Sequence, residues 1–284
     1  MVPHVVAVVM ALGSAAFGGA ADFIGGTVTR RVSPVVVVWW NQAIGLSLVV
    51  AYLTVTWSWP DDWGFAPWAV LAGLSSLLGL VSFYLALAVG KMSIVAPIPA
   101  LGVIVPLLWG VMGGERPQAV QLVGIAVAIL GVVLSTGPEV GGGLVLRPIL
   151  LASFAAVCFG CHMSFLSEAA AESVTGTVAV MKLTMVLTVI GGALFGAVAL
   201  GQGVPFLPFL ILLACLDVGT NVCFALGFQY GMVSVVAVVG SLYPVFTVLL
   251  ARVVHDERLI RVQISGVAVA LIGVALIAVG GSTH

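Results

Sequence analysis

The stretch QLVGIAVAILGVVL at residues 121–134 returns almost unchanged as QISGVAVALIGVAL at residues 263–276. Eight of the 14 positions are identical, more than a shared bias toward valine, alanine and glycine gives by chance. Further matches keep nearly the same offset of 141 or 142 residues, among them Phe17-Gly18 with Phe159-Gly160 and Glu115-Arg116 with Glu257-Arg258. We therefore predict two repeated halves, residues 1–141 and residues 142–284.

The composition places both halves in a membrane. Of the 284 residues, 62% are hydrophobic and 7% are charged, and the mean hydropathy is +1.30. Soluble domains carry about 25% charged residues, so this chain cannot build a water-facing surface. The net charge of −1 offers no basic surface to nucleic acid. The same composition excludes a disordered chain and a disulfide-rich secreted domain.

Apolar runs of membrane-spanning length follow one another along the chain. A helix crosses the hydrocarbon core in about 20 residues, and the runs are continuous, without the alternation of a β-barrel. The sequence predicts an all-α integral membrane protein with ten spans, near residues 4–28, 34–57, 67–89, 93–113, 118–137, 147–168, 176–200, 207–230, 233–254 and 261–281. Only short loops remain, so any function must lie in or at the membrane.

The five predicted spans in each half give the repeat its functional meaning. An odd number of crossings forces the halves into opposite orientations, which makes them inverted-topology repeats. Such repeats underlie alternating access in secondary transporters, with a substrate site at mid-membrane between the halves. We therefore expect a transporter that binds a small molecule between its halves.

Paired motifs in the two halves resemble the EamA family of the drug/metabolite transporter superfamily. They are Phe83-Tyr84, Gly90-Lys91-Met92-Ser93, Pro97, Gly113-Gly114-Glu115-Arg116 and Gly124…Gly131, then Gly231, Ser234, Pro244, Asp256-Glu257-Arg258 and Gly266…Gly273. The resemblance implies two five-helix bundles and a secondary carrier or exporter of small metabolites such as amino acids. It also implies that helices one, three, four, six, eight and nine surround a central cavity. Members commonly carry an arginine in the second helix, where this chain has Trp39-Trp40-Asn41-Gln42.

Ionisable groups inside the predicted spans are the first candidates for a binding or coupling site, because lipid tolerates them only beside a cavity or a partner. Asp217 lies midway along the eighth span, and Asn221 follows four residues later on the same helix face. Together they are candidates for binding an ammonium group or a proton; the alternative is a buried carboxyl that is protonated or paired with Lys182. Asp22 is a second candidate for a cation near a gate, or a residue at the membrane edge. For Lys182 we favour a side chain that reaches the membrane surface.

Proline, serine and tyrosine side chains mark the predicted fourth and ninth spans. Pro97 and Pro99 lack backbone donors, and the carbonyl groups that they free are tolerated where they line a cavity. Ser241 and Tyr243 occupy the equivalent place in the second half, and Tyr84 adds a hydroxyl from the third span. We predict that these residues line the substrate site; helix kinks without ligand contact are the alternative.

Small residues on one face of the predicted fifth and tenth spans predict a packing seam, because they let helix backbones approach closely. They are Gly124, Ala128 and Gly131 in the fifth span and Gly266, Ala270 and Gly273 in the tenth. The seam joins two helices of one chain or two chains, so a monomer and a homodimer remain alternatives.

We expect no cofactor and no metal. Cys158-Phe-Gly-Cys161-His162 matches the haem-attachment pattern C-x-x-C-H, but it lies in a predicted span, where no aqueous domain holds a haem. The expected partners are a small-molecule substrate, a coupling proton and the lipids of the cell membrane, with no nucleic acid.

An integral-membrane enzyme acting on lipid or isoprenoid substrates is the main alternative to a transporter. It would need a convergent cluster of histidine and acidic residues, which are scattered here. We therefore expect a protein that is not an enzyme. The arginines and lysines of the loops favour termini outside the cytoplasm, whereas the resemblance suggests termini inside; both place the two termini on one side.

Overall fold

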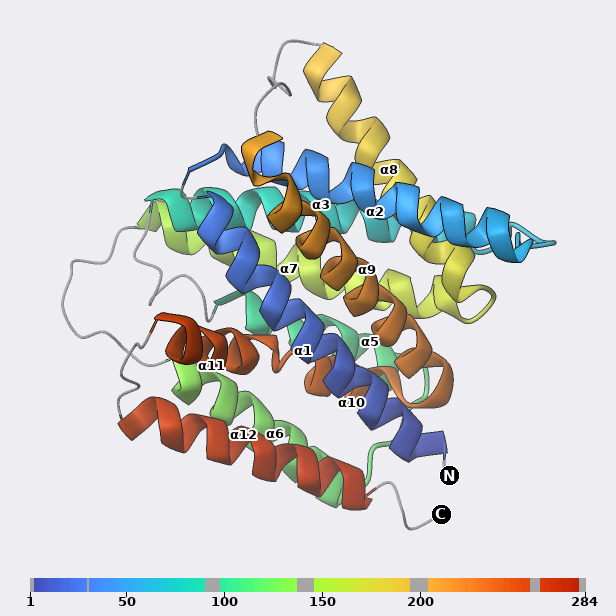
Figure 1. Cartoon of the computed structure of the whole chain (residues 1–284). Helices are drawn as coiled ribbons and strands as arrows, with labels where there is room; N and C mark the ends of the chain where they lie inside the picture. Colours follow the sequence, from blue (N-terminus) through green and yellow to red (C-terminus); the bar gives the residue numbers. More distant parts are fainter. Residues whose placement is uncertain are drawn as a thin grey trace.

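The computed structural model of the protein describes residues 3–29, 31–89, 98–136, 146–194, 204–255 and 261–280, which form helices and connecting turns without a strand among them (Figure 1). The six longest helices are α1 (Pro3–Thr29), α2 (Pro34–Thr56), α3 (Ala66–Val89), α7 (Leu146–Ala170), α8 (Val174–Leu194) and α9 (Leu207–Tyr230). The shorter elements are η1 (Ile98–Val103), α5 (Ile104–Met112), α6 (Ala119–Thr136), η2 (Val204–Phe206), α10 (Val233–Gly240), α11 (Tyr243–His255) and α12 (Arg261–Gly280). Both η elements are 3₁₀ helices.

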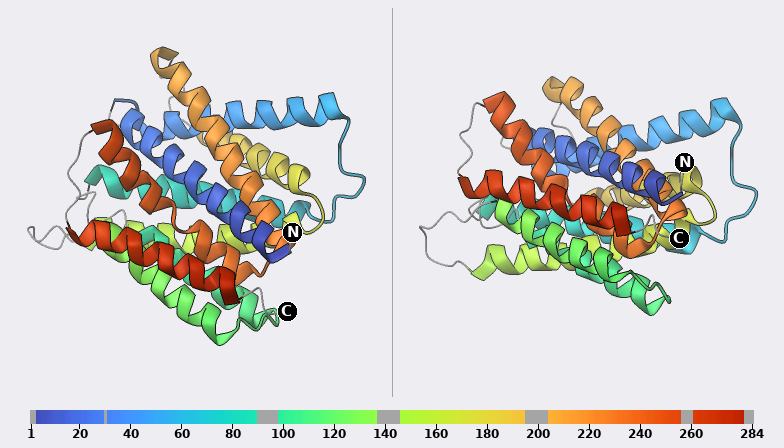
Figure 2. Two further views of the ribbon diagram at one scale, coloured as in Figure 1. Left: turned by 60° about the horizontal axis from the view of Figure 1, so that its bottom comes forward. Right: turned by 90° about the horizontal axis from the view of Figure 1, so that it is seen from below.

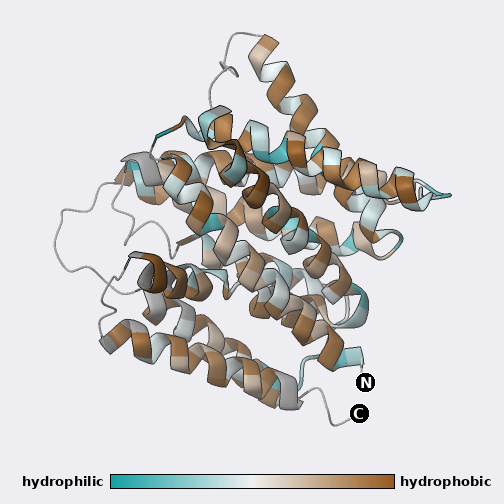
Figure 3. Ribbon diagram, in the orientation of Figure 1, coloured by the Kyte–Doolittle hydropathy of each residue, from teal (hydrophilic) through white to brown (hydrophobic). Residues whose placement is uncertain are grey.

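The length and polarity of the helices define a multi-pass integral membrane protein. In the part of the chain that the structure describes, six helices are long and apolar enough to cross a membrane, and four shorter apolar helices accompany them. Large apolar side chains such as Leu78, Leu122 and Leu187 are exposed on the outside of the bundle, where lipid accommodates them and water would not. Figure 3 shows apolar residues along the helices and few hydrophilic residues in the middle of the bundle.

The predicted ninth span is interrupted near its middle. Helix α10 ends at Gly240, a two-residue turn follows, and α11 begins at Tyr243. Pro244 explains the new start, because a proline has no N–H to donate and fits the first turn of a helix. In the first half the 3₁₀ helix η1 runs directly into α5, so the corresponding region is irregular as well.

Helices of one half pack along helices of the other in exchanged pairs. Helix α1 packs along α9, and the repeat counterparts of these two helices, α7 and α3, also pack along each other. Helix α6 packs along its own counterpart α12, which Figures 1 and 2 both show beside it, and α2 packs along its counterpart α8. The main hydrophobic core contains side chains from both halves, so the centre of the bundle is the interface between them.

Small residues hold α6 and α12 together within one chain. A Cβ added to Gly124 would lie 2.9 Å from the carbonyl oxygen of Gly273, and one added to Gly131 would collide with the backbone nitrogen of Ala270. A Cβ on Gly273 would likewise collide with the backbone of Ala128. Gly266, the remaining residue of the predicted seam, is buried. The small side chains thus permit a close backbone approach that larger ones would prevent.

The start of α1 and the end of α12 lie at the same end of the bundle (Figure 1). His4 Nε2 is 3.2 Å from the carbonyl oxygen of Ile277, so the two helix ends are in contact. The first described helix therefore begins, and the last one ends, on one side of the bundle.

Candidate functional site

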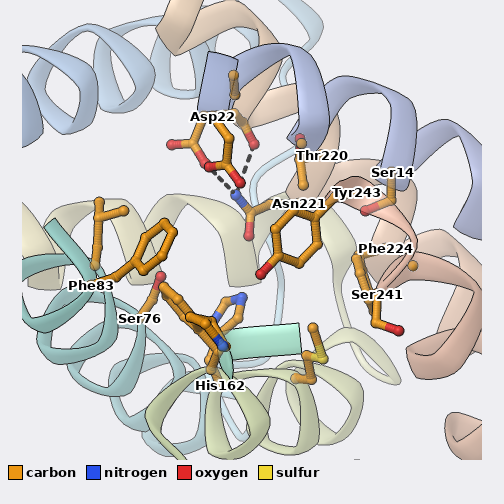
Figure 4. Close-up of a pocket in the computed structure, with 18 of the residues that line it drawn as sticks. Ser14, Asp22, Ser76, Phe83, His162, Thr220, Asn221, Phe224, Ser241 and Tyr243 are labelled. Atoms are coloured by element: carbon orange, nitrogen blue, oxygen red, sulfur yellow. Dashed lines mark hydrogen bonds between the residues drawn. The ribbon is translucent and has the colours of Figure 1, made fainter. Parts of the chain in front are cut away.

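A cavity of about 150 Å³ lies between the two halves, near the middle of the long helices. An engineered cavity of about this size holds benzene, so the space suits a small solute. Its walls come from α1, α2, α3, η1, α7 and α9, and from the end of α10, the start of α11 and the turn between them. Figure 4 shows Asp22, Phe83, His162 and Tyr243 around the same space. The polar lining residues are Ser14, Asp22, Gln42, Ser76, His162, Asp217, Thr220, Asn221, Ser241 and Tyr243.

A buried ion pair at one wall of the cavity joins three helices. The Lys182 ammonium on α8 donates to Asp217 Oδ2 on α9 and, at 2.8 Å, to Gln42 Oε1 on α2. Asn41 Nδ2 donates to the same Asp217 oxygen at 2.9 Å, and Asn221 Nδ2 donates to Oδ1 at 3.1 Å. Helix α2 belongs to the first half and α8 and α9 to the second, so the network ties the halves together.

Our expectation that Lys182 reaches the membrane surface is wrong. Its side chain is only 1% exposed, because Asp217 and Gln42 accept hydrogen bonds from the ammonium inside the bundle. A buried charge is tolerated when an opposite charge and hydrogen bonds compensate its lost hydration. The alternative that we kept for Asp217, pairing with Lys182, describes the arrangement in the structure.

Asp22 lies on the cavity side of α1. It shares one face of this helix with Ser14 and Gly18, which also line the cavity. Among the described residues, no hydrogen bond and no ion pair reaches its carboxylate, although Asp217 is close enough to interact with it electrostatically. The Tyr84 hydroxyl approaches the same helix one turn further on, where a Cβ added to Gly25 would lie 2.7 Å from it. Asp22 therefore faces the cavity, and no described lysine or arginine pairs with it.

Two buried polar atoms near the cavity have no hydrogen-bond partner among the described residues. They are Ser14 Oγ, which lines the cavity, and Asn41 Oδ1, beside the ion pair. Buried polar groups are nearly always satisfied, so an unmatched one at a cavity wall indicates a site for a polar ligand or for water. We did not predict Ser14 or Gln42 as site residues from the sequence. The only indication there is that each is a polar residue within an apolar run.

Aromatic rings form much of the remaining wall. Phe83 and Phe159 meet edge to face with ring centroids 6.3 Å apart, and Phe83 stacks on Tyr84 at 6.0 Å. Phe224 and Tyr243 line the cavity from the second half. The cavity thus combines a carboxylate with apolar and aromatic surface.

Of the residues predicted at the kinks of the fourth and ninth spans, some line the cavity and one cannot be placed. Pro99 and Ser241 line the cavity, from η1 and from the turn that precedes α11. The Ser241 hydroxyl donates to the carbonyl oxygen of Val238 at 2.7 Å, so its own hydrogen bond is already made. Pro97 lies outside the described residues.

The thiols and the histidine of the C-x-x-C-H pattern have separate surroundings. Cys158 and Cys161 are free, and His162 Nδ1 lies 3.1 Å from the carbonyl oxygen of Ala72. Over the described ranges, no group of three histidine, cysteine or acidic side chains is arranged to hold a metal ion.

Two acidic side chains join the halves at the end of the bundle where α1 begins and α12 ends. Glu115, which follows α5, accepts hydrogen bonds from the backbone nitrogens of Val233 and Ser234 at the start of α10. Trp109 Nε1 donates to Glu168 Oε1 at 2.8 Å. Glu115 thereby caps a helix of the other half, whose first N–H groups have no partners within the helix.

The fold and this cavity define a multi-pass helical membrane protein built in the manner of a transporter. The model of the EamA-like transporter family matches residues 5–137 and 146–279, two matches that together cover nearly the whole chain. The chain belongs to this family. The two matches lie on either side of residue 141, and the domain boundary there stays a prediction.

The fold is also found among solved structures. One, described only as "Crystal structure of protein", superposes with a TM-score of 0.77 over 95% of this chain and 95% of that chain, at 18% sequence identity. This likeness concerns the fold alone. A comparison with curated proteins found no match.

Proposed function

We propose that the protein is a secondary transporter of the cell membrane that exports small polar metabolites, such as amino acids, by alternating access. The observation that carries this proposal is the polar cavity between the halves, near the middle of the helices. A ligand there touches both halves, so a change in how the halves meet changes access to it.

The exchanged helix pairs support ten spans in two inverted repeats. The most extensive contacts between the halves, apart from the contact of α6 with its own counterpart α12, come in corresponding pairs: α1 packs along α9 as α7 packs along α3, and α2 packs along α9 as α8 packs along α3. Two-fold-related halves produce this pattern, and with five spans each they have opposite orientations. The interrupted ninth span supports the same view, because discontinuous helices often form transporter sites.

The contacts at the terminal end of the bundle support a gate. Glu115 binds the start of α10, and Trp109 binds Glu168, so two links between the halves lie on one side of the cavity. Alternating access requires such links to break when the cavity opens on that side. The cavity carboxylates are candidates for a coupling proton. The α6–α12 seam lies within one chain, which supports a monomer surrounded by lipid.

Transport by this cavity is tested in proteoliposomes that contain the purified full chain. We expect saturable uptake and counterflow for members of a panel of amino acids and small amines. Ser76→Trp fills the cavity and abolishes this flux, whereas Leu78→Trp, on the exposed side of the same helix, preserves it. Unchanged flux in Ser76→Trp, or flux without saturation and counterflow, contradicts the proposal.

A further inference from the structure

We infer that the cavity selects small organic cations, primary amines with a compact apolar body, and that Asp22 is their counter-ion. This inference rests on the proposed transport function, because it names the substrate class of the same cavity. It narrows that function, since it disfavours amino acids that carry a carboxylate as well as an ammonium group.

Among the described residues that line the cavity, one carboxylate has no positive charge paired with it. Asp22 and Asp217 line the cavity, and Lys182 is paired with Asp217. Gln42 and Asn41 complete the surroundings of that pair, so it is a neutral, hydrogen-bonded unit. Asp22 is the carboxylate for which a ligand can supply the missing positive charge.

The titratable side chains that line the cavity with Asp22 also suit a cation. His162 Nδ1 lies 3.1 Å from the carbonyl oxygen of Ala72, which can only accept, so Nδ1 donates in this hydrogen bond. Tyr243 on α11 supplies a hydroxyl group that accepts as well as donates, whereas Tyr84, which we predicted at the site, is not among the described residues that line the cavity. None of these side chains brings a fixed positive charge.

The aromatic side chains of the cavity also favour an organic cation. Phe83 and Phe159 lie against each other at one side, and Phe224 and Tyr243 line the cavity from the other half. The negative faces of aromatic rings attract cations, and their apolar area stabilises the body of the ligand. With a volume of about 150 Å³, the cavity has room for an amine built on a single ring.

A carboxylate on the ligand would find no matching charge. No lysine or arginine is among the cavity-lining residues that the structure describes, and the Lys182 ammonium is already bound by Asp217 and Gln42. The carboxylate would lose its hydration beside two carboxylates of the protein, which is strongly unfavourable. We therefore expect amines to bind better than the amino acids that share their side chain.

Four related probes separate the contribution of each charge. Benzylammonium carries the cation on one ring, phenylglycine adds a carboxylate to the same carbon, benzyl alcohol replaces the ammonium by a hydroxyl, and benzoate is an anion. Binding of radiolabelled benzylammonium to the purified full chain, and its displacement by the other three, gives their relative affinities. We expect benzylammonium to bind about tenfold or more tightly than benzyl alcohol, because hydrogen bonds between charged groups exceed neutral ones by this amount. It should exceed phenylglycine and benzoate by about tenfold or more as well, because each of these would bury a carboxylate beside the carboxylates of the protein.

Substitutions assign the preference to Asp22. Asp22→Asn should remove the advantage of benzylammonium over benzyl alcohol, Asp22→Glu should restore most of it, and Asp61→Asn, the same change in an exposed loop, should leave it intact. If Asp22→Asn does not fold, the probe series on the unmodified chain still decides. Equal binding of phenylglycine and benzylammonium, or an undiminished preference in folded Asp22→Asn, overturns the inference.

The outcomes also separate this inference from the proposed function. Counterflow of an amino acid without a preference for benzylammonium would leave the transporter proposal standing and refute the cation site. Binding of benzylammonium that depends on Asp22, without counterflow of any amine, would support the cation site and refute the transporter proposal.

Discussion

Asp22 and Asp217 line the same cavity, but the surroundings of the two carboxylates differ. Asp217 receives hydrogen bonds from Lys182, Asn41 and Asn221, whereas no hydrogen bond or ion pair reaches Asp22 in the part of the chain that the structure describes. A fully matched charge contributes to the contact between helices, and an unmatched one awaits a ligand or a proton. The comparison moves the first candidate for binding from Asp217 to Asp22.

The largest expected effect follows from removal of the ammonium at Asp217. Lys182→Met leaves an uncompensated carboxylate between α2, α8 and α9, so the free energy of unfolding should fall by about 3–5 kcal/mol. Unfolding by titration with SDS in mixed micelles measures this change. The double variant Lys182→Met/Asp217→Leu should recover most of the loss, because it removes both charges of the pair. If Lys182→Met hardly changes the free energy of unfolding, Asp217 does not depend on its ion pair, and the two carboxylates do not differ in the way described.

A smaller effect is expected at the contact between Glu115 and the start of α10. Glu115→Ala removes the acceptor for two backbone N–H groups at the start of α10 and should cost about 1–2 kcal/mol of stability, as the loss of a helix cap does. The same unfolding titration measures it. Arg116→Ala, an exposed neighbour, serves as the control and should change little. Equal stability of the two variants would show that the cap does not hold the halves together.

Loss of Asn221, a neutral partner of Asp217, should reduce the free energy of unfolding by a smaller amount. Asn221→Ala removes hydrogen bonds to the Asp217 carbonyl oxygen at 2.8 Å and to Oδ1 at 3.1 Å. Lys182 and Asn41 still bind the carboxylate, so the expected cost is about 1 kcal/mol. Thr220→Val is the matched change next to it, because the Thr220 hydroxyl bonds only within its own helix, to Leu216 at 2.8 Å. A loss as large as that of Lys182→Met would mean that Asn221, and not Lys182, holds the carboxylate.

The smallest effect on stability is expected at the unmatched carboxylate. Asp22→Asn breaks no hydrogen bond or ion pair in the described part of the chain, so the free energy of unfolding should stay within about 0.5 kcal/mol or rise. The SDS titration should then give this variant about the same free energy of unfolding as the unmodified protein. A loss of several kcal/mol would show that Asp22 has a structural partner and would weaken its assignment as a counter-ion.

The sequence predicts the helices better than it predicts their contacts. The predicted spans 34–57 and 207–230 correspond to α2 (Pro34–Thr56) and α9 (Leu207–Tyr230), because apolar runs and flanking prolines determine where membrane helices begin and end. The kink before Pro244 also follows from local chemistry.

The arrangement around Asp217 could not be predicted in the same way. Lys182 lies 35 residues from Asp217 and 140 residues from Gln42, so their meeting depends on how three helices rotate against one another. Apolar residues surround each helix almost uniformly, so their pattern does not specify this rotation. The repeat indicates that the halves meet, and only the structure shows which polar groups meet between them.

The comparison of the two carboxylates is tested most directly by the rise in Tm that benzylammonium causes in the purified protein. A ligand that binds only the folded protein raises Tm. We expect a clear rise in the unmodified chain and in Lys182→Met/Asp217→Leu, and no rise in Asp22→Asn. A rise that persists in Asp22→Asn and disappears in the double variant would contradict the account, because it would make Asp217 the carboxylate that binds the cation.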